Sequence, residues 1–374
     1  MPAYNDLRPD ADFDEMDFEL AFPGGLSQAV KKRTIEYLLA LRKGLDQQVS
    51  VKKSDYNLLI ASWNIKEFGH TKQRLPEAYY YTAEIMSRFD LIVVQEVKST
   101  LKDLHIVMRI LGDDWSYIVN DITEGRAGNR ERSAYIFNQK RVEFAGLAGE
   151  IVLWDDLTTD STIKQLKRTP TITGFKAGWK TFAVICFHLE PGDDSDDVTF
   201  RRTEVELLLA ALAEKKSKKR LFTENLILAG DFNFYSGANK DDPTVRLITN
   251  AGFKEVEGLM GVDTNASETQ RYDRLFLTTD DDYFTLAIDN LGTENGGVFN
   301  PFDFVFKHDE RETYKQQMKT VYGGSSNLDD PDVLERYFRD YWRKNQMSDH
   351  YPIWFELITD SADEFLTEKL ASFN

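Results

Sequence analysis

The apolar and polar positions of the chain follow two periods. Short apolar runs bounded by polar or glycine residues predict strands, and apolar residues three or four positions apart predict helices. The expected strands cover residues 58–63, 91–94, 134–138, 171–175, 181–188, 226–229, 272–277, 283–288 and 352–357. The expected helices cover residues 26–45, 76–89, 99–111, 198–213 and 333–343, and Ser99 is the expected N-cap of the third. Several strands follow one another directly, which favours a mixed sheet or pair of sheets with outer helices over a regular parallel barrel.

The order of these elements predicts one large domain, since no internal repeat or low-complexity linker divides the chain. We expect that domain over residues 23–360, with an irregular insertion at 289–347. Residues 1–22 would form an acidic lead, loose over residues 6–19 because Asp and Glu dominate there. Residues 361–374 would form a C-terminal tail.

Composition adds the general class of protein. The 374 residues are 41% apolar and 29% charged, as in ordinary soluble globular proteins. No apolar run approaches the ~20 residues that span a bilayer, and the first residues lack the basic and apolar regions of a signal peptide. The single cysteine, Cys186, lies in an apolar run, so no disulfide forms within the chain. These features favour a reducing, cytoplasmic setting.

The net charge of −17 argues against a protein that coats nucleic acid broadly, because such proteins need a basic surface. It leaves open an enzyme that holds a few phosphates through a metal ion and local arginines.

Polar residues lie at or beside the ends of apolar strands six times. They are Asn64, Glu96, His188, Asp231 with Asn233, Asp273, and Asp349 with His350. In the sequence N-L-I-L-A-G-D-F-N, which starts at Asn225, a glycine lets the backbone turn before the carboxylate and the carboxamide. A strand followed by an Asx-turn explains that stretch in isolation. Six such endings in one chain favour a single cleft lined by strand ends.

The side chains at these endings indicate a particular chemistry. Asn64, Glu96 and Asp349 are hard oxygen ligands that suit Mg²⁺ or Mn²⁺. A lone cysteine and the absence of a close histidine pair argue against zinc. His188 and His350 suit proton transfer, because imidazole titrates near neutrality. A divalent cation with two histidines fits a phosphodiester hydrolase.

Three arginines, Arg126, Arg130 and Arg132, lie in a glycine-containing stretch beside Glu131. Their guanidinium groups could clamp a phosphate backbone bidentately. A flexible, solvated loop explains the same residues equally well.

Eight short motifs, taken together, resemble one known family. They are W-N-I-K-E-F at 63, V-Q-E-V-K at 94, E-R-S-A-Y at 131, K-R-T-P at 167, F-H-L at 187, G-D-F-N at 230, Y-D-R at 272 and S-D-H-Y-P at 348. In this order, over about residues 58–357, the chain resembles the endonuclease/exonuclease/phosphatase superfamily. The resemblance implies the DNase I-like fold of the α+β class: a four-layer α/β/β/α sandwich of two mixed sheets flanked by helices.

The resemblance also implies roles for the residues around a metal ion. Asn64 and Glu96 match the metal-side pair of the family, and Asp349 would lie near the same ion. Asp231 and Asn233 would hold the scissile phosphate or the attacking water. Arg168 of K-R-T-P matches a family position that supports the site structurally.

Two carboxylate–histidine pairs follow from the same resemblance. Glu131 matches the carboxylate that orients His188, which would act as general acid. Asp273 matches the carboxylate that orients His350, which would act as general base. The chain departs from the family at Ser133, where a tyrosine is usual.

The favoured function is a Mg²⁺-dependent endonuclease that cleaves DNA. Lys98 supports this, since it stands where nucleases of this fold often carry an arginine that enters a DNA groove. RNA as substrate and cleavage from an end remain open. One alternative is a phosphatase, or a lipid or small-molecule phosphodiesterase, of the same fold. Another is a non-catalytic effector, which is disfavoured because every acid, base and ligand position is filled.

Overall fold

Two mixed sheets face each other at the centre of the fold in the computed structural model, which describes residues 2–11, 22, 25–53, 55–69, 73–122, 131–235 and 242–373. Sheet A contains six described strands in the order β11 (Gly296–Val298), β12 (Ile353–Ile358), β1 (Asn57–Phe68), β2 (Leu91–Lys98), β4 (Glu131–Asn138) and β3 (Trp115–Val119). Sheet B contains six in the order β5 (Glu143–Glu150), β6 (Thr171–Ala177), β7 (Lys180–His188), β8 (Leu226–Asp231), β10 (Asp273–Thr278) and β9 (Lys254–Glu255).

The central strands of the two sheets are parallel to a neighbour, and the outer pairs are antiparallel. β1 runs parallel to β2 in sheet A, and β7 runs parallel to β8 in sheet B. The sequence accounts for this position, because residues 58–61 of β1 and 226–229 of β8 are apolar runs that are buried on both faces of their sheets.

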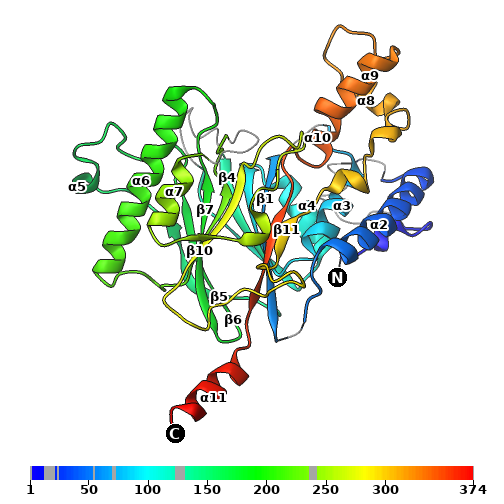
Figure 1. The fold of residues 1–374 in the computed structure, drawn as a ribbon. Coiled ribbons are helices and arrows are strands. Elements are labelled where there is room, and N and C mark those ends of the chain that lie inside the picture. The colour runs from blue at the N-terminus through cyan, green and yellow to red at the C-terminus, as the bar shows by residue number, and fades with distance from the viewer. Residues whose placement is uncertain are drawn as a thin grey trace.

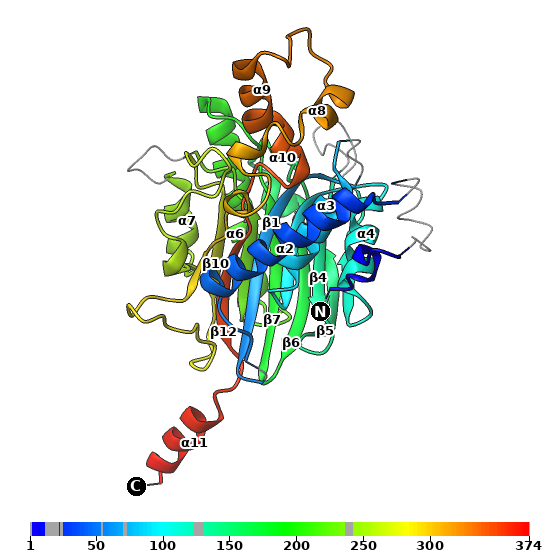
Figure 2. The same ribbon diagram turned by 90° about the vertical axis from the view of Figure 1, so that its right-hand side faces the viewer.

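Helices cover the outer face of each sheet (Figures 1 and 2). On sheet A these are α2 (Gln28–Gln48), α3 (Pro76–Met86) and α4 (Lys102–Leu111); on sheet B they are α6 (Ser195–Ser217) and α7 (Thr244–Asn250). The remaining α-helices are α5 (Asp155–Thr158), α8 (Lys315–Val321), α9 (Pro331–Tyr337), α10 (Arg343–Gln346) and α11 (Ala362–Ala371). One apolar core lies between the sheets and one lies under each helical layer. The predicted four-layer α/β/β/α sandwich is confirmed.

Two expected local structures are wrong. Residues 283–288 form no strand: Leu286 and Ile288 make only isolated bridges, to Leu357 and Glu294. Ser99 is not the cap of α4, which begins at Lys102 after a turn in which the Leu101 amide donates to the Lys98 carbonyl. The edge strands β3 and β5 were not predicted.

The two ends of the described chain differ from the loose segments expected. Asn5–Leu7 is a short 3-10 helix in which Asp6 accepts hydrogen bonds from Tyr80 and Arg109, so the loose lead is wrong at its beginning. Residues 12–21 lie outside the described residues. At the other end α11 projects from the sandwich, on the side opposite α8, α9 and α10 (Figure 1). The domain boundaries at 23 and 360 stay predictions.

None of the described helices combines the length and the apolar content that a bilayer crossing needs.

Candidate active site

The strand-end residues of both sheets meet at one edge of the sandwich. His188 ends β7 and lies in register with Asp231, which ends the parallel strand β8. Asp273 begins β10 and pairs with Asp231 in the antiparallel register. Sheet A brings Asn64 and Glu96 to the same edge from β1 and β2, and His350 from the loop before β12.

One oxygen, Oδ2 of Asp231, lies at the centre of this group. The Asn64 amide donates to it at 3.0 Å and the Asn233 amide at 3.2 Å. Nε2 of His188 lies 3.7 Å from the same oxygen, and Nε2 of His350 lies 3.8 Å from it. The structure therefore brings together two imidazoles, two carboxamides and a carboxylate from distant parts of the sequence.

Gly230 makes the position of Asp231 possible. Its φ is +140°, and a Cβ at this position would lie 2.1 Å from the carbonyl oxygen of Phe187 on the neighbouring strand. Only glycine fits there. After Gly230, the backbone N–H of Asn233 donates to Oδ1 of Asp231 at 2.8 Å, which forms an Asx-turn. The Asx-turn and the candidate site are therefore compatible, because the turn uses Oδ1 of Asp231 and leaves Oδ2 facing the other site residues.

His350 is held by a buried carboxylate. Its Nδ1 lies 2.8 Å from Oδ2 of Asp273, and the hydroxyl of Thr264 donates to the same oxygen at 2.8 Å. Nε2 of His350 is thereby left facing Asp231. Burial alone would lower the pKa of His350, but the negative charges of Asp273 and Asp231 outweigh it and raise that pKa well above the ordinary value.

His188 has an equivalent carboxylate. Its Nδ1 lies 3.2 Å from Oε2 of Glu131, and the ammonium group of Lys98 lies 3.0 Å from Oε1. Burial raises the pKa of Glu131, but the hydrogen bond and charge of His188 and the charge of Lys98 prevail and lower it to about 2. Lys98 is thus ion-paired beside the site rather than extended toward a DNA groove.

Asn64 and Glu96 supply oxygen atoms on the sheet A side. Oδ1 of Asn64 is fully buried and has no hydrogen-bond partner among the described residues. Glu96 lies in the irregular register between β1 and β2 with φ +59°, and its Oε2 accepts from the Glu67 amide at 2.9 Å. A non-glycine residue held at positive φ carries strain, which is common at functional sites.

An orphaned amide oxygen beside a carboxylate fits a hard cation that keeps several of its own waters, as Mg²⁺ does. Asn64 and Glu96 would hold it. Asp349 is engaged otherwise: Lys66 lies 2.9 Å from its Oδ2. Desolvation raises the pKa of this half-buried carboxyl, but the charges of His350 and Lys66 outweigh it and hold that pKa below its ordinary value. No group of three or more His, Cys, Asp and Glu side chains in the described part of the chain is arranged to hold a metal. The protein-derived ligand set is therefore small.

The arginines of the expected phosphate clamp separate into two groups. Arg126 and Arg130 lie outside the described residues. Arg132 is half-buried on β4 and lines a small hollow with Glu96 and His188. Arg168 lies 3.5 Å from Oε2 of Glu131 and donates to the Leu189 carbonyl at 3.2 Å, so it braces the Glu131–His188 pair.

Relatives of this chain are consistent with such a site. Deoxyribonuclease-1 of Canis lupus familiaris is 29% identical over 231 residues, which are 59% of this chain and 76% of that protein. Deoxyribonuclease-1 of Homo sapiens is 28% identical over 255 residues, which are 64% of this chain and 81% of that protein. The chain is therefore similar to proteins of the DNase I-like endonuclease/exonuclease/phosphatase superfamily. This similarity indicates an enzyme that hydrolyses phosphoester bonds.

Solved structures of superfamily members also match. An endonuclease/exonuclease/phosphatase family protein from Bacteroides thetaiotaomicron has a TM-score of 0.48 at 16% identity, over 81% of this chain and 98% of that one. The human Nocturnin catalytic domain has a TM-score of 0.48 at 13% identity, over 82% and 96%. No family model matches the chain.

Three residues that support the candidate active site were not singled out from the sequence. They are Thr264, Lys66 and Ser348. The Ser348 hydroxyl donates to the Asn64 carbonyl at 2.6 Å and accepts from the His350 amide at 3.1 Å, so it ties two site segments together. Ser348 lies within the motif S-D-H-Y-P, which was a usable signal, whereas Thr264 lies in an irregular loop that carries none.

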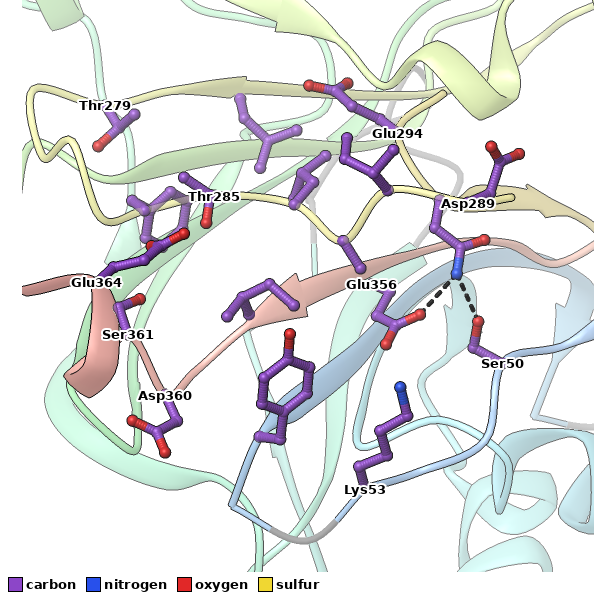
Figure 3. Close-up of a pocket in the computed structure, with 18 of the residues that line it drawn as sticks. Ser50, Lys53, Thr279, Thr285, Asp289, Glu294, Glu356, Asp360, Ser361 and Glu364 are labelled. Atoms are coloured by element: carbon purple, nitrogen blue, oxygen red, sulfur yellow. Dashed lines mark hydrogen bonds between the residues drawn. The ribbon is translucent and has the colours of Figure 1, made fainter. Parts of the chain in front are cut away.

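A much larger hollow, of about 1330 Å³, lies at the opposite end of the sandwich from the site (Figure 3). Its lining includes Glu356, which accepts hydrogen bonds from Asn295 and Asn57 at 2.6 Å each. None of the histidines that the structure describes lines it. Its size alone therefore does not make it the candidate active site.

Proposed function

We propose that the chain is a metal-dependent phosphodiesterase that cleaves nucleic acid, with internal bonds of DNA as the first candidate substrate. The observation that carries the proposal is the convergence of both imidazole Nε2 atoms on Oδ2 of Asp231, at 3.7 and 3.8 Å. Two proton-transfer groups beside one carboxylate suit an in-line displacement, in which a nucleophile loses a proton as it attacks phosphorus and the leaving alkoxide gains one.

His350 would act as the general base and His188 as the general acid. A carboxylate repels a phosphate but accepts a hydrogen bond from water, so Asp231 would position the attacking water between itself and Nε2 of His350. Asn64 and Asn233 would keep Asp231 in place through their amide groups. Glu131 and Asp273 would fix the orientation of the two rings through Nδ1.

Mg²⁺, or Mn²⁺, would be held by Asn64 and Glu96. When bound, such a cation supplies positive charge that stabilises the phosphoryl oxygens and offsets the carboxylates that raise the pKa of His350. Asp349, paired with Lys66, would add negative charge nearby.

A plasmid-nicking assay with Mg²⁺, with Mn²⁺ and with EDTA tests this function. We expect nicked circles with either cation and none with EDTA. A parallel reaction with bis(p-nitrophenyl) phosphate reports phosphodiester chemistry without a nucleic acid. Hydrolysis of the small ester without nicking would transfer the function to a lipid or small-molecule phosphodiesterase. Inertness toward both substrates would favour a non-catalytic effector. The cytoplasmic location stays a prediction.

A further inference from the structure

The insertion places a basic and aromatic helix beside the candidate active site. We call residues 331–346 the insertion helix; it comprises α9, a π-helical turn (Phe338–Trp342) and α10. Leu334, Phe338 and Trp342 are fully buried at intervals of four residues and fix one face of this helix against the body. The other face is therefore presented to solvent at the end of the sandwich opposite α11 (Figure 1).

The solvent face has a charge unlike that of the rest of the chain. The insertion helix holds four cations, Arg336, Arg339, Arg343 and Lys344, and three carboxylates, of which Asp332 and Glu335 precede the cations. Its part from residue 336 to 344 therefore contains four cations and one carboxylate, whereas the whole chain holds 46 Lys and Arg against 63 Asp and Glu. A local excess of positive charge attracts an anionic polymer.

The cations of this face are only partly neutralised. Arg339 is paired with Asp340 at 2.7 Å. Arg336, Arg343 and Lys344 have no carboxylate within ion-pair distance in the part of the chain that the structure describes. Burial is the main cause that lowers the pKa of Arg343 and of Lys344. The charge of Arg339 also lowers the pKa of Arg343, and the charges of Lys66 and Arg343 lower that of Lys344. An added anion would favour the charged form of both side chains.

Tyrosine rings lie next to these cations. Tyr337 and Tyr341 are stacked with ring centroids 5.6 Å apart, and Tyr341 is half exposed. They line a hollow of about 750 Å³ together with Arg336. Exposed aromatic rings interleaved with cations are the features on which single-stranded nucleic acid stacks its bases and rests its phosphates.

The hollow shares one lining residue with a second hollow, which is also lined by the residue that follows His350. Asp340 lines both this hollow and a second one of about 440 Å³, which also contains Arg343, Lys344 and Tyr351. Tyr351 follows His350 directly, and Ala266 on the same wall donates to the Asp349 carbonyl at 2.8 Å. Two carboxylates here, Glu268 and Asp303, accept hydrogen bonds from Asn300 at 3.2 Å each.

We infer that the insertion helix is the docking surface for a single-stranded segment of the nucleic-acid substrate. The strand would leave the catalytic histidines past Tyr351, place phosphates on Lys344, Arg343 and Arg336, and stack bases on Tyr341 and Tyr337. Lys344 lies eight positions after Arg336, which is about 12 Å along the helix. A few nucleotides can extend over this distance. This inference rests on the proposed function, because it assumes that the substrate is a nucleic acid.

The test measures binding of a fluorescein-labelled 20-nucleotide thymidine strand by anisotropy, in EDTA and over a series of salt concentrations. A gel confirms that the strand stays intact. We expect Arg336→Ala with Lys344→Ala to weaken binding by about tenfold and to reduce the slope of log K against log salt by about 1.4. Tyr341→Ala should weaken binding roughly fivefold or more through lost stacking, whereas Tyr341→Phe should bind as the natural chain does.

A charge-matched control is Lys219→Ala with Arg220→Ala, two exposed cations beyond the end of α6. It should leave affinity and salt slope unchanged. Unchanged binding by the Arg336/Lys344 variant, or an equal loss in the control, would overturn the inference. If Tyr341→Ala weakened binding of a 20-base-pair duplex as much as binding of the single strand, the inference that a single-stranded segment docks here would be overturned. The binding measurements are made in EDTA and do not depend on hydrolysis. A chain that binds the strand through the insertion helix but fails to nick plasmid DNA would contradict only the proposed function.

Discussion

At the scale of single residues, each histidine of the site has one nitrogen held by a carboxylate and the other directed at Asp231. The two carboxylates differ in their surroundings. The ammonium group of Lys98 neutralises Glu131, whereas the described side chains that contact the Asp273 carboxylate are the Thr264 hydroxyl and His350 itself. The two imidazoles therefore have different charge environments, which is the condition for one to give a proton while the other takes it.

Replacing either histidine tests their roles. We expect His188→Ala and His350→Ala each to lower turnover of plasmid DNA by roughly 10²–10⁴-fold, the usual scale for loss of a general acid or base. Circular dichroism and thermal unfolding should show an intact fold. His105→Ala is the matched control, because this exposed histidine on α4 interacts with the Tyr117 side chain and not with the site residues named above. Near-normal turnover in either site variant would remove that histidine from the mechanism.

At the scale of elements, α6 carries an inward-facing carboxyl, Glu204, under the K-R-T-P loop. Its Oε1 accepts from the Lys167 amide at 2.8 Å, and burial raises its pKa from 4.5 to about 7. Between these two values the folded chain keeps a proton that the unfolded chain has lost. Stability contributed by this group is therefore present at low pH and declines as the pH rises from 4.5 toward 7.

We expect Glu204→Gln to flatten this part of the stability profile, because the amide cannot ionise. Urea unfolding at pH 5, 6, 7 and 8 measures it: the variant should gain stability relative to the natural chain at pH 8, and less or none at pH 5. Glu206→Gln, on the exposed side of the same helix, should show no such trend. A parallel shift of the Glu204 variant at every pH would contradict the elevated pKa.

The elements that the sequence predicted are those whose burial is decided locally. β8 and β7 are continuous apolar runs, and both were expected within one to two residues of their observed bounds. β3 and β5 lie at sheet edges, where half-exposed residues blur the alternation that reveals a strand. Residues 283–288 have a strand-like pattern but form one isolated bridge with β12, Leu286 to Leu357, beyond the part of β12 that pairs with β11.

The site follows the same division. Strand-end residues such as Asp231 and His188 were visible because each follows a strong strand signal. The contacts of Thr264 with Asp273 and of Lys66 with Asp349 depend on how loops distant in sequence approach each other. No local pattern encodes such an approach. The strand-end residues were thus predictable, whereas much of what supports them was not.

At the scale of the whole molecule, neither sheet holds the site alone. Sheet A provides Asn64 and Glu96, and sheet B provides His188, Asp231 and Asp273. The core between the sheets keeps these groups at their distances. Phe175 of β6 is fully buried there, with ring centroids 5.5 Å from Phe137 and 5.9 Å from Tyr135 on β4 of the opposite sheet.

We expect Phe175→Ala to lower the free energy of unfolding by about 3–5 kcal/mol, because it leaves a cavity between the sheets. Activity and tryptophan fluorescence should then be lost at the same urea concentration, since separation of the sheets dismantles the site. Phe175→Leu should give the same coincidence with a smaller shift. Loss of activity well before the fluorescence change would show that the site can open while the sandwich stays folded.

The buried position of Cys186 has a practical consequence. This thiol is 1% exposed, and burial raises its pKa to about 11, so a maleimide reagent at neutral pH will leave it unmodified. Since it is the only cysteine in the sequence, the natural chain will not react with the dye and can receive one engineered cysteine for site-specific labelling. A dye attached to one engineered thiol on α11, at the pole remote from the histidines, would follow substrate capture by energy transfer without obstructing it.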